Sequence, residues 1–102
     1  MKIYDILLHT PIGKREGELT AKIENRKIKG FLSLFGNVEP LEGTVDENGG
    51  CSLKGKFVTL MKTVDFTANG TINYEVLHLA IKGDCGYYEM VGALRNAKEA
   101  NS

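Results

Sequence analysis

The chain has 102 residues, of which 42% are hydrophobic and 25% are charged, as expected of one small globular domain with a single core. Its 13 basic and 13 acidic residues cancel, so the charge favours neither nucleic acid nor an anionic membrane surface as a partner. No apolar run approaches the roughly 20 residues of a membrane helix, and no signal-peptide pattern opens the chain. We therefore expect a cytoplasmic protein with no membrane insertion.

The first third of the chain predicts a strand, a loop and a hairpin. Residues 2–9 are rich in aliphatic side chains without clean alternation, which is typical of a strand partly covered on both faces. Residues 10–15 predict a loop, because a proline and a glycine interrupt strand pairing there. Residues 18–24 alternate between apolar and polar side chains and predict a half-buried strand. A tight turn at Asn25-Arg26 then leads into a returning strand over residues 28–34.

A glycine-centred repeat runs through the rest of the chain. In Leu41-Glu-Gly-Thr-Val45 an apolar residue, a glycine and another apolar residue fall two positions apart. This spacing is the period of one face of a β-strand, so each copy predicts a strand with a glycine on its apolar face. The other full copies are residues 28–32, 53–57, 68–72 and 90–94, and residues 81–85 form a near copy.

Turn signals separate these copies. A turn at Gly36-Asn37 precedes the strand that holds Leu41, and Pro40 is tolerable only near the start of that strand. The turn-rich segment 46–50 leads into a strand over residues 51–59.

Two further hairpins complete the chain. After a turn at residues 60–62, a strand over 64–72 ends in a turn at 73–75. A type I′ turn at Asn69-Gly70 is the alternative, but it would cut that strand short and break the phase of the repeat. A strand over 76–82, a turn at 83–86 and a strand over 87–95 follow.

These elements predict an all-β domain of eight antiparallel strands in an up-and-down meander. A meander of this size removes its edges best by closing into a barrel, and a two-sheet β-sandwich is the alternative architecture. The domain spans residues 1–95, and residues 96–102 form a short tail. Glycines on the inner face would let the strands bend and would leave space for larger neighbours or a ligand.

The phase of the repeat predicts which side chains form the core. Both thiols, Cys51 and Cys85, are in phase with apolar neighbours, and we expect small reduced core residues. If Leu77 and Leu79 face inward, His78 points to solvent. The predicted core members are Leu41, Val45, Leu53, Phe57, Val64, Phe66, Ile72 and Leu94.

The strand pattern resembles the calycin-like barrels, of the lipocalin and streptavidin type, and in particular small bacterial domains of that shape. The resemblance is carried by Thr10-Pro11-Ile12-Gly13, Leu41-Glu-Gly-Thr-Val45 and Ala68-Asn-Gly-Thr-Ile72. It implies a closed barrel and no particular ligand. The chain has no tryptophan, whereas lipocalins carry a Gly-x-Trp near their first strand and streptavidin grips its ligand with tryptophans. The Arg-x-Tyr of fatty-acid-binding proteins is missing after Arg95.

No residue pattern predicts catalysis or a cofactor. His9 and His78 are the two histidines, and neither has a nucleophile and an orienting group at a recognisable spacing. Metal-ligand spacings, a calcium loop and a phosphate-binding loop are missing as well. We therefore expect a non-enzymatic protein with no cofactor.

Alternate loops of a meander lie at the same end of the barrel, and one end gathers apolar residues beside cations. Three readings remain open for this rim: a plug that packs into the barrel, the mouth of a ligand site, or a contact for a second copy or another partner. The favoured function is binding of a small apolar or amphipathic molecule, with the cations attracting an anionic group. The alternative is a filled barrel that uses the rim for a homodimer or partner contact. The candidate mouth residues are Ile12, Lys14, Arg15, Phe35, Leu60, Met61, Lys62 and Tyr87.

Overall fold

The computed structural model describes residues 2–11, 13–58, 62–73, 75–83 and 86–95. They form eight strands: β1 (Lys2–Thr10), β2 (Gly13–Glu24), β3 (Lys27–Leu34), β4 (Asn37–Val45), β5 (Gly50–Val58), β6 (Thr63–Ile72), β7 (Val76–Gly83) and β8 (Gly86–Leu94). Among the described residues there is no helix long and apolar enough to cross a membrane.

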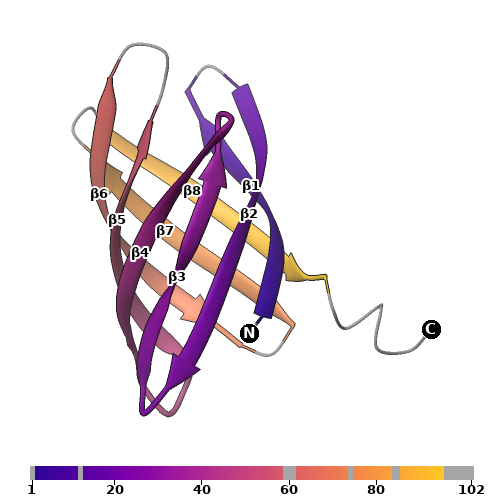
Figure 1. The fold of residues 1–102 in the computed structure, drawn as a ribbon, viewed down its shortest axis with the longest axis vertical. Helices are drawn as coiled ribbons and strands as arrows, with labels where there is room; N and C mark the ends of the chain where they lie inside the picture. Colours follow the sequence, from indigo (N-terminus) through magenta and orange to yellow (C-terminus); the bar gives the residue numbers. More distant parts are fainter. Residues whose placement is uncertain (1, 12, 59–61, 74, 84–85, 96–102) are drawn as a thin grey trace.

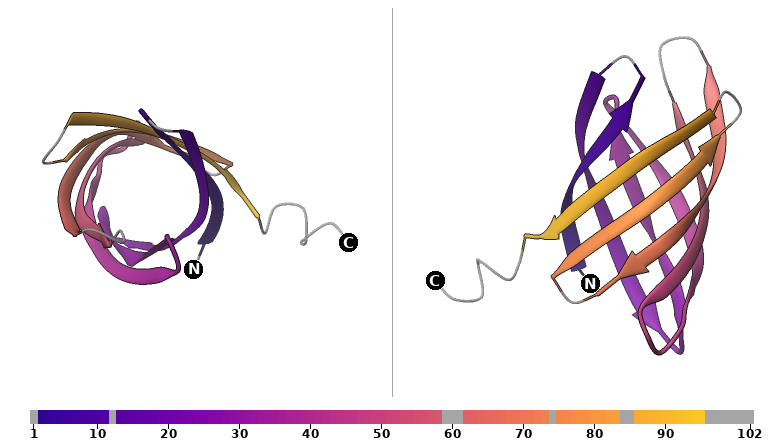
Figure 2. Two further views of the ribbon diagram at one scale, coloured as in Figure 1. Left: turned by 90° about the horizontal axis from the view of Figure 1, so that it is seen from above. Right: turned by 180° about the vertical axis from the view of Figure 1, so that it is seen from behind.

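The strands follow one another around a closed barrel, as the meander predicts (Figure 1). Every neighbouring pair is antiparallel, and β1 pairs with β8 from Tyr4↔Leu94 to His9↔Glu89, which closes the ring. Figure 2 shows the ring seen from above. The sandwich alternative is wrong, because no pair of open sheets is present in the described barrel.

Two hairpin loops contain non-glycine residues in the left-handed region. Asn25 and Arg26 have φ values of 50° and 64°, and Phe35 and Gly36 have φ values of 55° and 77°. Two successive residues of this kind form a type I′ turn, whose twist matches that of the strands on either side. Asparagine and glycine adopt this conformation readily, whereas a bulky residue such as Phe35 is strained in it.

The extent of one predicted loop and the position of one proline differ from the structure. The loop expected over residues 10–15 is shorter, because Gly13 already pairs with Thr10 and Arg15 with Leu8. The positive φ of Gly13, at 131°, lets β2 begin immediately after the turn. Pro40 is the fourth residue of β4 and pairs with Phe31 of β3, while the ladder with β5 ends one residue short of it, at Leu41↔Gly55.

The interior confirms the predicted phase of the strands. Seven of the eight predicted core residues are buried, and Val45 is half-buried and packs against them. Cys51 is a buried free thiol, and Cys85 lies outside the described residues. His78 is exposed, with its Nε2 atom 3.2 Å from Glu89 Oε2. The most deeply buried large side chains are Tyr4, Leu8, Leu19, Ile28, Leu32, Leu79, Ile81 and Met90.

The repeat glycines allow close contact between strands, and the expectation that they leave space for larger neighbours or a ligand is wrong at three of them. A Cβ atom on Gly30 would lie 1.7 Å from the carbonyl oxygen of Thr20. On Gly43 and Gly70 the corresponding distances to a neighbouring carbonyl oxygen are both 2.0 Å. The space that a side chain would need is thus filled by backbone, which lets the strands coil tightly around a small barrel.

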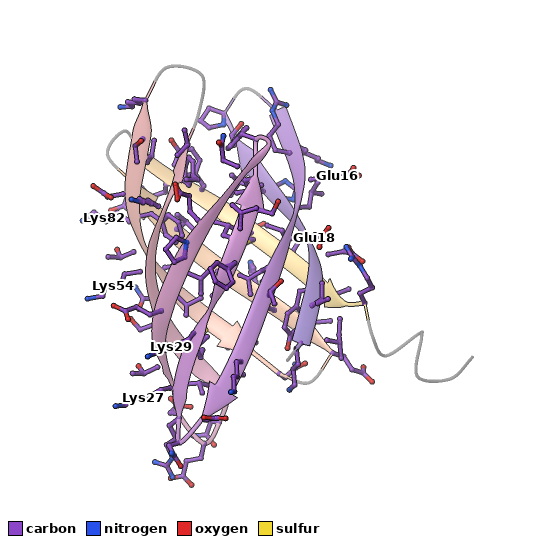
Figure 3. All side chains as sticks on the ribbon, viewed as in Figure 1. Glu16, Glu18, Lys27, Lys29, Lys54 and Lys82 are labelled. Carbon is purple, nitrogen blue, oxygen red and sulfur yellow. The ribbon has the colours of Figure 1, made fainter. Side chains whose placement is uncertain are left out.

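Charged side chains cover the outside of the wall. Figure 3 shows the labelled residues Glu16, Glu18, Lys27, Lys29, Lys54 and Lys82 pointing away from the barrel. Each is exposed. The alternation that buries one face of each strand therefore places its charges in solvent.

Candidate functional site

The two ends of the barrel differ in the residues that their loops bring together. The upper end in Figure 1 holds the β1–β2, β3–β4, β5–β6 and β7–β8 connections. The lower end holds the other three connections and both ends of the barrel-forming chain. At the lower end, one side chain stabilises the β4–β5 turn. Asp46 Oδ1 accepts hydrogen bonds from the N–H groups of Asn48 and Gly50, at 2.8 and 2.9 Å.

The wall is interrupted between β4 and β5 towards the upper end. Their ladder has five pairs, from Val45↔Cys51 to Leu41↔Gly55, although both strands continue beyond the last pair. In the same register Pro40 would be the next residue to pair, opposite Lys56. By contrast β5 and β6 pair over nine positions up to Val58↔Thr63. We call the unpaired stretch between residues 37–40 and 56–58 the open seam.

Pro40 explains why the ladder stops where it does. Alternate residues of an antiparallel strand direct their backbone groups to opposite neighbours. The N–H of Val45 donates to Arg26 on the β3 side at 2.9 Å, so the even-numbered residues of β4 face β5. Pro40 therefore presents its nitrogen to β5 at the position of the next backbone hydrogen bond, and proline has no N–H to donate.

One side chain spans the upper part of the open seam. Asn37 Nδ2 donates to the carbonyl oxygen of Phe35 at 3.1 Å and also lies 3.5 Å from that of Val58. The second contact joins β4 to β5 where their backbones are not paired. It is long for a hydrogen bond, and Asn37 is exposed, so this bridge is weak.

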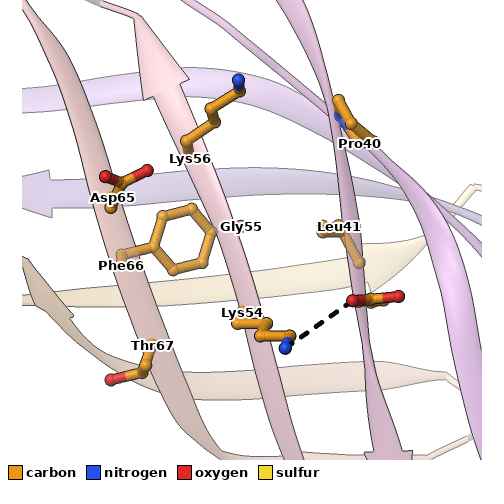
Figure 4. A pocket seen from close by; sticks show the side chains of 9 residues that line it. Pro40, Leu41, Lys54, Gly55, Lys56, Asp65, Phe66 and Thr67 are labelled. Atoms are coloured by element: carbon orange, nitrogen blue, oxygen red, sulfur yellow. Dashed lines mark ion pairs between the residues drawn. The ribbon is translucent and has the colours of Figure 1, made fainter.

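A groove of about 600 Å³ lies on the outside of the wall at the lower limit of the open seam. Its inner surface includes Leu41, Gly55 and the ring of Phe66, which lies beside Gly55 in Figure 4. The charges around it balance, and Lys54 Nζ lies 3.7 Å from Glu42 Oε1. Its lining residues are Pro40, Leu41, Glu42, Lys54, Gly55, Lys56, Asp65, Phe66 and Thr67. The groove thus brings core side chains within reach of the outer surface.

An aromatic cluster lies on the inner side of the same region. The ring centroid of Phe57 lies 5.8 Å from that of Phe35, 5.8 Å from that of Phe66 and 6.0 Å from that of Tyr88. Phe57 and Phe66 are buried, whereas Phe35 is 36% exposed. Phe35 therefore covers the cluster from the solvent side at the tip of the β3–β4 hairpin.

The structure places five of the eight candidate mouth residues, and Ile12, Leu60 and Met61 lie outside the described residues. Lys14 and Arg15 follow Gly13 at the start of β2, and Lys62 precedes β6. Arg15 pairs with the buried Leu8, but its side chain is exposed at the end of the barrel, where its Nη1 donates to the carbonyl of Lys14 at 3.0 Å. Tyr87 is 74% exposed and occupies an outward-facing position of β8.

Two residues of this region with an inward phase were not among the candidates predicted from the sequence. Tyr88 has the inward phase of Met90 and contacts Phe57, and extending the repeat of residues 90–94 backwards by two positions would have identified it. Glu39 shares the phase of Leu41 and pairs with the buried Leu32. The same alternation places this carboxylate on the inner face of β4, at the height of the open seam.

The chemistry of the described residues does not single out a catalytic group. No group of three or more His, Cys, Asp and Glu side chains in the described ranges is arranged to hold a metal ion. Burial, together with the charge of Asp46, raises the pKa of the Cys51 thiol, which disfavours the reactive thiolate. Burial also raises the pKa of Tyr4, whose hydroxyl donates to the carbonyl oxygen of Asn73 at 3.0 Å.

No protein-family model, no curated protein and no solved structure matches the chain.

Proposed function

We propose that this barrel binds a small apolar or amphipathic molecule at its upper end, without catalysis, in the manner of calycin-like carriers. The observation that carries the proposal is the aromatic cluster of Phe35, Phe57, Phe66 and Tyr88 beside the open seam. Apolar and aromatic surface with a few convergent polar groups is typical of a small-molecule site.

The position of the glycines restricts where such a molecule would bind. At three repeat glycines, neighbouring backbone occupies the position that a side chain would take. The lower part of the barrel is packed with side chains such as Tyr4. In this proposal the molecule therefore binds against the aromatic cluster at the upper end, beside the β3–β4 hairpin.

The charges of the upper end favour an anionic head group. Lys14, Arg15 and Lys62 belong to this end, and Arg15 is exposed on β2 opposite the buried Leu8. Glu39 is the acidic group with an inward-facing position in the same region. We place the carboxylate or similar anion of the ligand near Arg15, with its apolar part against the aromatic cluster.

Native mass spectrometry and thermal unfolding with octanoate, dodecanoate and palmitate test this proposal. A molecule that binds the folded state raises the melting temperature with its concentration, so we expect a saturable rise and one bound carboxylate per chain. Failure of all three to bind or to raise the melting temperature would contradict the carrier function.

A matched pair of variants tests the head-group position. Arg15→Gln should weaken dodecanoate binding by about 3- to 10-fold, which is the effect of losing one exposed charge contact. Lys22→Gln, which removes an exposed charge from β2 next to Glu24, should leave the affinity unchanged. Equal effects of both variants would mean that the attraction is general and that Arg15 has no special position.

A second candidate function is a contact with another copy of the chain or with a partner protein. Phe31 and Val38 are 49% and 63% exposed, and Phe31 pairs directly with Pro40 on the outer face of β3 and β4. These three side chains form a small apolar patch, which is a common feature of protein interfaces. Under this function the purified protein should be dimeric in native mass spectrometry, and Phe31→Ser should make it monomeric.

A further inference from the structure

The open seam and the β3–β4 hairpin tip share one location. The ladder between β4 and β5 ends at Leu41↔Gly55, and the same two strands approach the upper end without backbone pairing. Pro40 prevents the next hydrogen bond, so this part of the wall is held by side chains. Separating it from its neighbour would break fewer backbone hydrogen bonds than separating a fully paired seam.

The tip of the hairpin is strained. Phe35 has a φ of 55° at the first position of a type I′ turn, where glycine and asparagine are favoured. Its ring is held against Phe57 at 5.8 Å between centroids. Strain in a bulky residue persists where surrounding contacts enforce it, and it often marks a segment that moves.

The contact that links this hairpin to β5 is weak. Asn37 Nδ2 lies 3.5 Å from the carbonyl oxygen of Val58, and the amide is exposed to water, which competes for both groups. Phe35 and Asn37 are close neighbours in sequence, and Asn37 also donates to the carbonyl of Phe35. One movement of the hairpin tip would release the ring from Phe57 and the amide from Val58 together.

We infer that the β3–β4 hairpin tip is a lateral gate, with Phe35 as its lid and Asn37 as its latch, through which a small apolar or amphipathic molecule reaches the aromatic cluster. The inference rests on the proposed function, because it concerns access to the same binding space. Opening the gate separates β4 from β5 above Pro40 and leaves the five ladder pairs below it intact.

A pair of glycine variants tests the lid. Phe35→Gly removes the ring and relieves the strained turn, so the hairpin retains its type I′ geometry. We expect the association rate of anilinonaphthalene sulfonate, measured by stopped-flow fluorescence, to rise about tenfold, which corresponds to a barrier lower by about 1.4 kcal/mol. The dissociation rate should rise at least as much, because the ring is also lost from the aromatic cluster. Asn25→Gly changes the equivalent position of the β2–β3 turn at the lower end, with a φ of 50°, and should leave both rates unchanged.

A disulfide tests the open seam itself. Val38 and Val58 would face each other if the β4–β5 register continued, and both have outward-facing positions. In a Cys51→Ala and Cys85→Ser background, oxidised Val38→Cys with Val58→Cys should slow both rates at least about tenfold, and reduction should restore them. Thr44→Cys with Ser52→Cys, on a paired part of the same ladder, should have no effect on the rates in either redox state.

The outcomes separate this inference from the proposed function. The proposed function fails if the unaltered protein does not bind dodecanoate and also does not bind anilinonaphthalene sulfonate at a site from which dodecanoate displaces it. If it binds both, but Phe35→Gly and the oxidised seam leave the rates unchanged, the binding site stands and the lateral gate is wrong.

Discussion

The seam between β1 and β8 and the seam between β4 and β5 close the same wall in different ways. β1 and β8 are distant in the sequence, yet their ladder is prolonged beyond its last strand pair by the Arg95 N–H, which donates to the carbonyl of Ile3 at 2.8 Å. β4 and β5 are joined by a short turn, and their ladder ends early at Pro40. A hairpin tolerates a partial ladder because its turn already holds the strands together, whereas strands from opposite ends of the chain depend on every contact.

Side chains reinforce the closing seam further. The Arg95 guanidinium binds the carboxylate of Asp5 on β1, with Nε 3.0 Å from Oδ1, and its Nη1 lies 3.3 Å from Glu18 Oε1 on β2. One residue thus connects three strands of the wall. At the upper end of the open seam, the described residues make the Asn37 bridge to Val58 and the ring contact of Phe35 with Phe57. The comparison indicates that the molecule is firm at its closing seam and loose beside the aromatic cluster.

The largest expected effect tests whether packing holds the region of the open seam. Phe57→Ala removes a buried ring that contacts three other rings, and it should lower the free energy of unfolding by about 3–5 kcal/mol. Thr67→Ala, at an exposed position of β6, should change it by less than about 0.5 kcal/mol. Chemical denaturation measures both. Similar values for the two variants would contradict the inward phase of Phe57.

A smaller effect is expected where closely approaching strands need a glycine. Gly30→Ala would place a Cβ atom 1.7 Å from the carbonyl oxygen of Thr20, and the backbone must shift to accommodate it. We expect a loss of about 1–3 kcal/mol in urea unfolding. Gly55→Ala should lose less, because its nearest contacts are side-chain atoms of Leu41 and Phe66 at 3.1 and 3.2 Å. If Gly55→Ala lost more stability than Gly30→Ala, the backbone of the wall would shift more easily than the core side chains repack.

The closing seam also has a partly buried polar contact. Tyr4 pairs with Leu94 across this seam, and its hydroxyl donates to the carbonyl oxygen of Asn73 at 3.0 Å. Tyr4→Phe keeps the ring and leaves that carbonyl without this donor, so the loss should be about 1 kcal/mol. Equilibrium unfolding is the measurement, with Tyr87→Phe at an exposed ring as the control. An unchanged stability in Tyr4→Phe would mean that water replaces the hydroxyl at no cost.

The smallest effect is a dependence of stability on pH at the closing seam. The hydrogen bond from Arg95 lowers the pKa of Asp5, so folding favours the ionised carboxylate. The stabilisation is therefore present above the ordinary aspartate pKa of about 3.9 and is lost as the pH falls through the lower value of the folded state. Arg95→Gln should lower the melting temperature slightly at neutral pH, and the two proteins should converge in acid. A difference that is constant with pH would assign the effect to packing of the Arg95 stem.

The fold could be predicted because it depends on local alternation. The phase of Leu41 and Val45, carried through the repeat, correctly placed the inner faces of the strands, and the Asn73-to-Glu75 turn followed from keeping that phase. The exposure of His78 followed from the same rule. Alternation is a property of each strand alone, so no knowledge of its neighbours was needed.

The seams could not be predicted, because they depend on which strand faces which. The sequence shows Pro40, but only the register reveals that its nitrogen faces β5 and ends the ladder. The contact of Arg95 with Asp5 and Glu18 joins residues at opposite ends of the chain, and no spacing in the sequence indicates it. Tyr87 was chosen for the mouth by its place in a loop, whereas its neighbour Tyr88 has the inward phase.

The pairing of β1 with β8 sets the order of events during synthesis. The first strand is made while its partner, around residues 89–94, is still to be translated, a delay of roughly 5–20 s at ordinary ribosomal rates. Throughout that interval the nascent chain can form only an unclosed sheet, whose free borders are able to join those of other nascent chains. Asp5 and the polar side chains along β2 then help to keep this unclosed sheet in solution, a state that no longer exists once the barrel has closed. Truncation before β8 should therefore yield an aggregating sheet and not a smaller barrel.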